Sequence, residues 1–89
     1  MITKQITIIN KLGLHARAAA KLVSCASGYR SSVQLQRNGQ RVNGKSIMGV
    51  MMLAASQGSS IDLEISGDDE SEALSALENL INNRFGEDQ

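Results

Sequence analysis

The spacing of apolar residues switches along this chain between a period of two and a period of about 3.6. Alternating apolar and polar residues are typical of strands with one buried face, and they occupy residues 2–8, 32–36 and 61–66. Apolar residues three and four positions apart are typical of helices with one buried stripe, and they occupy residues 16–27, 46–57 and 69–86. Because the strands alternate rather than being apolar throughout, their sheet should bury one face and carry its helices on that side.

A fourth strand is predicted by the turn at residues 37–40. The pair Asn38-Gly39 suits the two positive-φ positions of a type I′ hairpin turn, and a short partner strand through Val42 should follow. The element order is then β-α-β-β-α-β-α, an α+β two-layer open-faced sandwich. A helical crossover returns a strand parallel to its predecessor, and the hairpin reverses the direction, so strand four has only antiparallel neighbours if it lies between strands one and two. We predict a four-stranded antiparallel sheet in the order 1-4-2-3 with three helices on one face.

Single residues are expected to cap and bury the predicted helices. Ser46 occupies the natural N-cap position of the second helix, and Asp69 with Glu72 resembles a capping box at the start of the third. The second helix should bury a stripe of four residues, Ile47, Val50, Met51 and Ala54. In the first strand, Lys4 is the one polar residue on the apolar side.

The charge balance and the aromatic content exclude several classes of function. Nine Lys and Arg residues balance nine Asp and Glu residues, and the chain has one Phe, one Tyr and no Trp. Nucleic-acid binding needs a surplus of cations and usually aromatic platforms, so we expect none. The single Cys25 cannot form an intramolecular disulfide, and no cluster of His, Cys and acidic residues has the spacing of metal ligands. We therefore expect neither a metal nor a cofactor.

The sequence offers no membrane span and no targeting signal. No apolar run approaches the roughly 18 residues of a transmembrane helix, and Met1 is followed directly by a segment with the pattern of a strand. Residues 1–89 contain no proline, no low-complexity tract and no internal repeat that would mark a linker. We expect one domain over residues 1–89, a cytoplasmic location, no membrane insertion and a monomer.

The only histidine of the chain lies in the segment Asn10–Leu22, which reads NKLGLHARAAAKL. His15 directly precedes the first helical residues, where backbone N–H groups lack acceptors and the helix dipole places roughly half a positive charge. This field favours a neutral, nucleophilic imidazole and stabilises an anion attached to it. Arg17, in the first turn, adds donors that match phosphate oxygens. A lone histidine at a helix start is more often a capping or surface residue, but together these neighbours describe a histidine that can be phosphorylated.

Two stretches of the sequence resemble the signatures of one family. Gly13-Leu14-His15-Ala16-Arg17, followed by small apolar residues, resembles the active-site signature of HPr, the histidine-containing phosphocarrier of the bacterial phosphotransferase system. Residues 43–51, NGKSIMGVM, resemble that family's second signature, around its regulatory serine. The motifs lie about 30 residues apart, and the element order and the length also fit, so the resemblance covers essentially the full chain.

The resemblance implies a carrier that is phosphorylated by other proteins and has no independent turnover. His15 would accept a phosphoryl group on Nδ1 from the phosphoenolpyruvate-dependent first enzyme of the system and pass it to A-type acceptor domains, with Arg17 stabilising the phosphate. The family usually has proline where this chain has Ala18. Alanine leaves the helix start less rigid but frees one more N–H for the phosphate. The sequence does not decide between the sugar-transport and the nitrogen-related branches, although the serine motif favours carriers that meet a serine kinase.

Ser46 and the residues after it have two interpretations. From the residues alone, Ser46 is an N-cap worth on the order of 1 kcal/mol to its helix. The resemblance adds regulatory phosphorylation of Ser46 by a serine kinase/phosphorylase, which would act on docking rather than on folding. Met48 and Met52 lie one position off the buried stripe, so they are either core residues or, with Ile47, an exposed apolar patch near His15. The resemblance implies that partners dock on the first two helices, and the candidate contacts are Ala20, Ile47, Met48 and Met52. Met51 is expected in the core.

Two other classes of function compete with a phosphocarrier. A regulatory docking module, switched by phosphorylation of Ser46, would not need both His15 and Arg17. An RNA-binding sandwich with a similar element order would need exposed aromatic residues on its central strands. The predicted central strands offer aliphatic residues instead, namely Val33, Leu35, Ile61 and Leu63.

Overall fold

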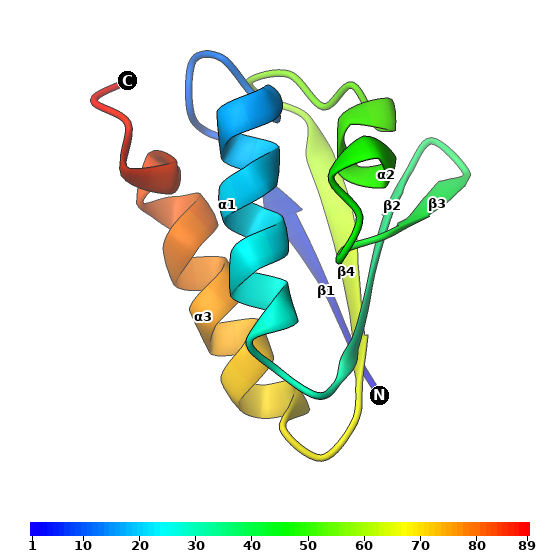
Figure 1. Ribbon diagram of the computed structural model, residues 1–89. Coiled ribbons are helices and arrows are strands. Elements are labelled where there is room, and N and C mark those ends of the chain that lie inside the picture. Colours follow the sequence, from blue (N-terminus) through cyan, green and yellow to red (C-terminus); the bar gives the residue numbers. More distant parts are fainter.

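The computed structural model describes residues 1–89 and forms two layers, a four-stranded antiparallel sheet and three helices that cover one of its faces (Figure 1). The elements in chain order are β1 (Ile2–Thr7), α1 (Ala16–Ser27), β2 (Ser32–Arg37), β3 (Gln40–Asn43), α2 (Ile47–Met52), β4 (Ser60–Ser66), α3 (Glu70–Asn82) and a short 3-10 helix, η1 (Arg84–Gly86). The predicted α+β fold class and the predicted element order are confirmed. No helix of the structure has both the length and the apolar character needed to cross a membrane.

The strands lie in the order β1-β4-β2-β3, and all pairs are antiparallel, as predicted. In the central strand β4, Leu63 faces Lys4 of β1 on one side and Leu35 of β2 on the other. The β2–β3 hairpin closes with Arg37 paired to Gln40, and the two residues between them, Asn38 and Gly39, have φ angles of 53° and 79°. These are the positive angles that a type I′ turn requires, which explains why Asn-Gly marked this turn.

The core lies between the covered face of the sheet and the helices. The alternation predicted for β4 is confirmed, since Ile61, Leu63 and Ile65 are buried. In α1 the small residues Ala18 and Ala19 are fully buried, so this helix can approach the sheet closely. Six other core residues from strands, helices and η1 are Val33, Leu35, Leu22, Leu77, Ile81 and Phe85.

Lys4, the polar residue on the apolar side of β1, is exposed at the edge of the sheet. Its Nζ lies 2.8 Å from Oε2 of Glu78 on α3. The apolar part of the long side chain therefore lies along the covered face, and its charged end forms an ion pair with α3.

The second helix is shorter and less buried than the sequence predicted. It ends at Met52 rather than near Gln57, and Ala54 has a φ angle of +50° outside the helix. Of the four residues expected in its buried stripe, only Val50 is buried, and Met51 is 41% exposed. The prediction of Met51 as a core residue was wrong, because the chain leaves the helix and buries Leu53 and Ala55 instead.

The capping box predicted for α3 is absent, although Asp69 is the N-cap residue. The Asp69 carboxylate accepts hydrogen bonds from the backbone N–H of Arg30 at 2.9 Å, the backbone N–H of Ser31 at 3.0 Å and the Ser31 hydroxyl. Gly67 allows this approach, since a Cβ at that position would lie 2.5 Å from the Ser31 Oγ. Asp69 therefore ties the start of α3 to the loop before β2 rather than capping its own helix.

Candidate functional site

His15 is the N-cap residue of α1, at the position that the sequence predicted. Its backbone is extended, with φ −76° and ψ 178°, and its carbonyl accepts the hydrogen bond of the Ala19 N–H at 2.8 Å. The imidazole forms no capping hydrogen bond, so the first N–H groups of α1 stay open toward an anion. The side chain is 29% exposed, which makes the ring accessible without leaving it fully in solvent.

The loop before His15 is fixed by the segment that follows α2. The Leu14 N–H donates to the Ala55 carbonyl at 2.9 Å, and the Leu14 side chain is buried. Gly13 has a φ angle of +67°, and a Cβ on it would lie 2.5 Å from the Ala55 carbonyl oxygen. Only glycine fits this position without a shift of the backbone. The Gly13-Leu14 pair of the motif therefore sets where the chain enters α1.

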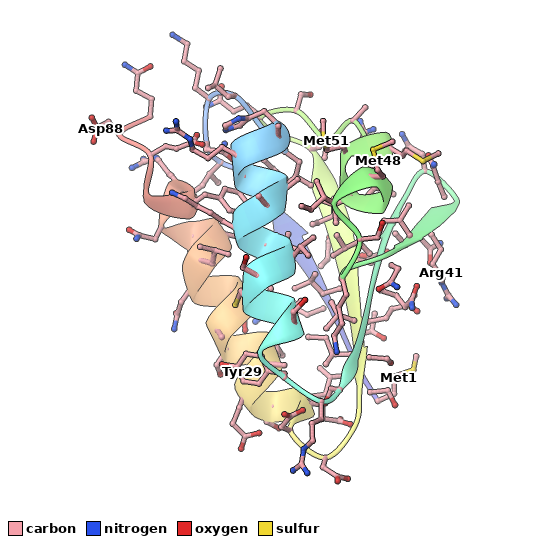
Figure 2. The ribbon with its side chains drawn as sticks, in the orientation of Figure 1. Met1, Tyr29, Arg41, Met48, Met51 and Asp88 are labelled. Atoms are coloured by element: carbon pink, nitrogen blue, oxygen red, sulfur yellow. The ribbon has the colours of Figure 1, made fainter.

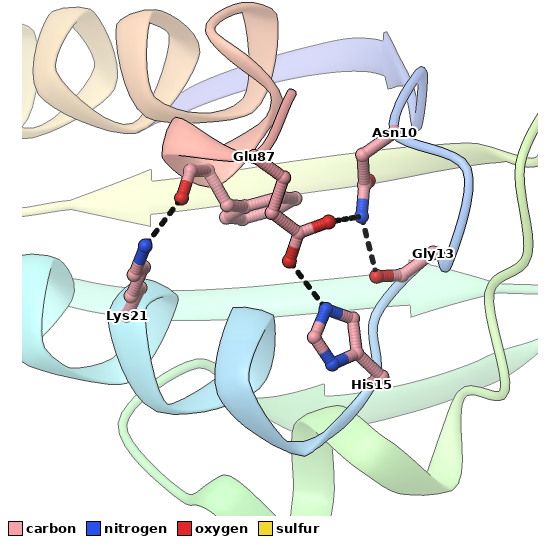
Figure 3. A network of polar contacts seen from close by, with 6 residues as sticks. Asn10, Gly13, His15, Lys21 and Glu87 are labelled. Atoms are coloured by element: carbon pink, nitrogen blue, oxygen red, sulfur yellow. Dashed lines mark hydrogen bonds and ion pairs between the residues drawn. The ribbon is translucent and has the colours of Figure 1, made fainter. Parts of the chain in front are cut away.

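The imidazole of His15 contacts a residue 72 positions away, Glu87 (Figure 3). The His15 Nε2 is hydrogen-bonded to Oε2 of Glu87, whose side chain is 15% exposed. The other carboxylate oxygen accepts a hydrogen bond from Nδ2 of the buried Asn10 at 3.0 Å. The same Asn10 nitrogen donates to the Gly13 carbonyl at 2.8 Å, so one amide links the His15 loop and Glu87.

The segment around Glu87 is anchored on both sides. Phe85 is fully buried, and its carbonyl accepts a hydrogen bond from Nζ of Lys21 on α1 at 2.6 Å (Figure 3). After Glu87, the carbonyl of Gln89 accepts from the Lys11 N–H at 3.1 Å. The carboxylate therefore reaches the imidazole from a segment that the core and two lysines hold in place.

The contact with His15 is electrostatic, and Glu87 is its anionic member. The hydrogen bond from His15, followed by that from Asn10, holds the pKa of the Glu87 carboxyl below its ordinary value. An ionised carboxylate can only accept, so Nε2 carries the proton of this hydrogen bond. The second ring nitrogen, Nδ1, is not engaged by the pair. The sequence predicted an imidazole kept neutral by the helix end alone, and it did not predict Glu87, which selects Nε2 as the ring nitrogen that carries the hydrogen-bonding proton.

Arg17 and His15 line the same open depression, which has a volume of about 790 Å³. The side chain of Arg17 is exposed and belongs to none of the ion pairs of the chain. The depression is lined by residues from the loop before α1, the first turn of α1 and the last segment of the chain: Lys11, Leu12, His15, Ala16, Arg17, Glu87, Asp88 and Gln89. An anion entering it meets the open end of α1 and a free guanidinium, which can bind phosphate oxygens.

Ser46 caps α2 as predicted, since its Oγ accepts the Gly49 N–H at 3.1 Å. The neighbouring Lys45 donates from Nζ to the Tyr29 carbonyl at the end of α1, at 2.9 Å. No group of three or more His, Cys, Asp or Glu side chains is arranged to bind a metal ion.

Four apolar side chains of α2 form an exposed patch, which we call the α2 patch. Its members and their exposed fractions are Ile47 (44%), Met48 (74%), Met51 (41%) and Met52 (62%). Helix α2 packs against α1, and Figure 2 shows Met48 and Met51 at the end of the molecule where α1 begins. Ala20, the remaining candidate contact, is partly buried. A large exposed apolar surface is typical of a binding site.

The sequence patterns did not find Glu87, Asn10 or Lys21, which complete the surroundings of His15. Asn10 carried a weak signal, as a polar residue directly after the apolar pair Ile8-Ile9. Glu87 and Lys21 carried none, because acidic and basic residues on helices and termini are usually solvated.

The comparisons with known proteins agree on one family. A family model described as the phosphotransferase-system HPr component phosphorylation site matches residues 2–83. The chain is 60% identical over 87 residues to the phosphocarrier protein HPr of Cupriavidus necator, and the match covers 98% of each chain. A crystal structure of HPr-C-His from Thermoanaerobacter tengcongensis has a TM-score of 0.96 and 47% identity, with all of both chains covered. Crh of Bacillus subtilis, described as a domain-swapped dimer, has a TM-score of 0.76 and 40% identity and covers 94% of this chain and 97% of its own.

Proposed function

Because the chain belongs to the HPr family of phosphocarrier proteins, we propose that His15 accepts a phosphoryl group from the phosphoenolpyruvate-dependent first enzyme of the phosphotransferase system and passes it to A-type acceptor domains. The observation that supports this most directly is the place of the ring. His15 is a partly exposed N-cap residue, its Nε2 is held by Glu87, and its Nδ1 is not engaged by that pair. A nitrogen lone pair then stands at the positive end of a helix, where an attached anion is stabilised.

Arg17 would bind the transferred group once it is attached to His15. It lines the same depression, and its guanidinium has donors in the planar arrangement that matches phosphate oxygens. In this proposal the protein is substrate and product of its partners and has no turnover of its own. Such a carrier must stabilise its phosphoryl group and still leave it accessible to the next protein. An open depression lined by His15 and Arg17 meets both needs.

The test is phosphoryl transfer from phosphoenolpyruvate through the first enzyme of each branch of the system. We expect one acid-labile, base-stable phosphoryl group per chain, none in His15→Ala, and normal labelling in Ser46→Ala. The first enzyme that labels the protein also identifies the branch. A failure of both enzymes to label the wild-type chain, or labelling of His15→Ala, would contradict the proposal.

Regulation through Ser46 is the second part of the proposal. A phosphate on Ser46 would add roughly two negative charges directly beside the α2 patch. A partner that makes apolar contacts with Ile47 and Met48 would then have this charge at the edge of its interface, which would disfavour the contact. We expect Ser46→Asp to weaken binding of the first enzyme without changing the fold, so its far-UV circular-dichroism spectrum should match that of the wild type.

The exposed α2 patch also favours a second candidate, a regulatory docking module controlled by Ser46. The two candidates differ in what His15→Ala does to partner binding and to transfer. A carrier loses all transfer in this variant, whereas a docking module keeps its regulatory effect on partners. We further propose that residues 1–89 act as one domain and as a monomer, for which light scattering should give a mass near 9.5 kDa.

A further inference from the structure

The geometry points to Glu87 as a positioning residue that keeps the proton on Nε2 of His15 during both the receipt and the release of the phosphoryl group. This inference rests on the proposed function, because it concerns the same imidazole. It goes beyond that function in assigning a role to a residue outside both sequence motifs. The new assignment is that Nε2 holds a proton against Glu87, whereas phosphorus on Nδ1 is what the family resemblance already implies.

The carboxylate is built to stay in place beside the ring. One oxygen accepts from Nε2 of His15, and the other accepts from Nδ2 of Asn10 at 3.0 Å. Asn10 is completely buried and also binds the Gly13 carbonyl, so it cannot swing away without disturbing the His15 loop. A surface glutamate that met the histidine by chance would not need a buried amide to orient it.

The order of bonds explains why this proton matters. On receipt, the Nδ1 lone pair forms the N–P bond, the bond from phosphorus to the donor atom breaks, and its electron pair leaves with the donor. The ring then carries phosphorus on Nδ1 and hydrogen on Nε2 and is cationic, beside an anionic carboxylate. On release, the acceptor's lone pair attacks phosphorus, and the N–P electron pair returns to Nδ1. The leaving group is neutral imidazole, and no proton moves in either step.

Without the Nε2 proton, the leaving group would be an imidazolate anion, which is much poorer. The carboxylate therefore favours release by keeping the phosphorylated ring protonated to a higher pH. The other charged groups near the ring are Lys11, Arg17 and Asp88, which line the depression, and Lys21, which lies behind Glu87. Only Glu87 is hydrogen-bonded to the imidazole.

The test uses the full chain phosphorylated with phosphoramidate, a small phosphoryl donor that needs no partner protein. Glu87→Gln is the informative variant, because its amide oxygen can still accept from Asn10 while the charge is gone. Glu72→Gln makes the same substitution at an exposed carboxylate on α3, outside the depression, and is the matched control. Nitrogen-15 NMR follows the Nε2 proton of the phosphorylated ring against pH, and phosphorus NMR follows hydrolysis.

We expect Glu87→Gln to lose the Nε2 proton at lower pH than the wild type and to hydrolyse more slowly at pH 8, by on the order of threefold to tenfold. Glu72→Gln should behave as the wild type. Identical titration in Glu87→Gln and the wild type, or an equal shift in Glu72→Gln, overturns the inference. Because no first enzyme is used, these outcomes are separate from a failure of the proposed carrier function, which would appear as absent labelling by phosphoenolpyruvate.

Discussion

At the scale of single residues, the surroundings of His15 combine one part that local sequence predicts and one part that it does not. The N-cap position of His15 and the nearness of Arg17 follow from their spacing around a helix start, which is local information. The contact with Glu87 joins residues 72 positions apart and depends on how Phe85 enters the core. The bend that brings Glu87 to His15 has φ angles of +55° at Arg84 and +54° at Phe85. Arginine and phenylalanine do not usually adopt such angles, so local sequence does not predict this bend.

Replacing Arg17 with alanine should slow phosphoryl transfer without unfolding the protein. The guanidinium is exposed and belongs to no ion pair, so its loss leaves no buried group unpaired. Hydrogen bonds to a charged group are worth about 1.5–3 kcal/mol, which corresponds to a transfer rate roughly tenfold to hundredfold lower. Rapid-quench transfer from the first enzyme measures the rate, and Arg30→Ala, an exposed arginine just beyond the far end of α1, is the control. A large drop in the melting temperature of Arg17→Ala instead would mean that the residue is structural.

At the scale of elements, the helix starts show how far capping patterns predict structure. Ser46 was predicted as a cap and accepts the Gly49 N–H. Asp69 was predicted as half of a capping box and instead binds the loop before β2. The Ser46 hydroxyl bonds within its own helix, whereas Gly67 lets Ser31 approach the start of α3 and bind the Asp69 carboxylate. A cap can be predicted from local sequence only when no tertiary donor competes for its side chain.

Ser46→Ala should destabilise the protein by about 1 kcal/mol, the usual cost of removing an N-cap hydroxyl. Ser46→Asp should stay within about 0.5 kcal/mol of the wild type, because aspartate is an equally good N-cap. Urea unfolding of the three proteins measures the free energy of unfolding. Equal losses in both variants would show that the hydroxyl has another role in α2.

Asp69→Asn should change how stability depends on pH. The hydrogen bonds from Ser31 and Arg30 lower the pKa of Asp69 from 3.8 to about 2, so the folded state favours the ionised carboxylate. A lowered pKa adds stability above the unfolded value, and this stability is lost as the pH falls from about 4 toward 2. The melting temperature of Asp69→Asn should lie below that of the wild type at pH 7, and the gap should narrow over this range.

The exposed neighbour Asp68 supplies the control for that experiment. The melting temperature of Asp68→Asn should follow that of the wild type at every pH, because the Asp68 side chain is exposed and belongs to no ion pair that acid could break. A gap between Asp69→Asn and the wild type that stays constant from pH 7 to pH 2 would count against the assigned hydrogen bonds.

At the scale of the whole molecule, the fold followed from the pattern of periods, whereas the end of α2 and the exposure of Met51 did not. Alternating strands, an Asn-Gly turn and helical crossovers leave few arrangements without a parallel neighbour, and the order β1-β4-β2-β3 is one of them. The pattern could not predict that α2 stops after six residues, because the buried positions Leu53 and Ala55 continue an apolar run past its end. Met51 thus joins the α2 patch instead of the core.

The central strand offers a direct test of this core. Leu63 is fully buried between β1 and β2, so Leu63→Ala should cost about 2–5 kcal/mol in the free energy of unfolding. Leu12→Ala, at a side chain that is 66% exposed, should change it by no more than about 0.5 kcal/mol. Similar effects of both substitutions on urea unfolding would be incompatible with the described packing.

The proposed carrier function depends most on which ring nitrogen of His15 receives phosphorus. In nitrogen-15-labelled protein phosphorylated by phosphoenolpyruvate and the first enzyme, NMR should show phosphorus coupled to Nδ1 of His15 and a proton retained on Nε2, facing Glu87. Phosphorus on Nε2, or on any residue other than His15, would contradict it.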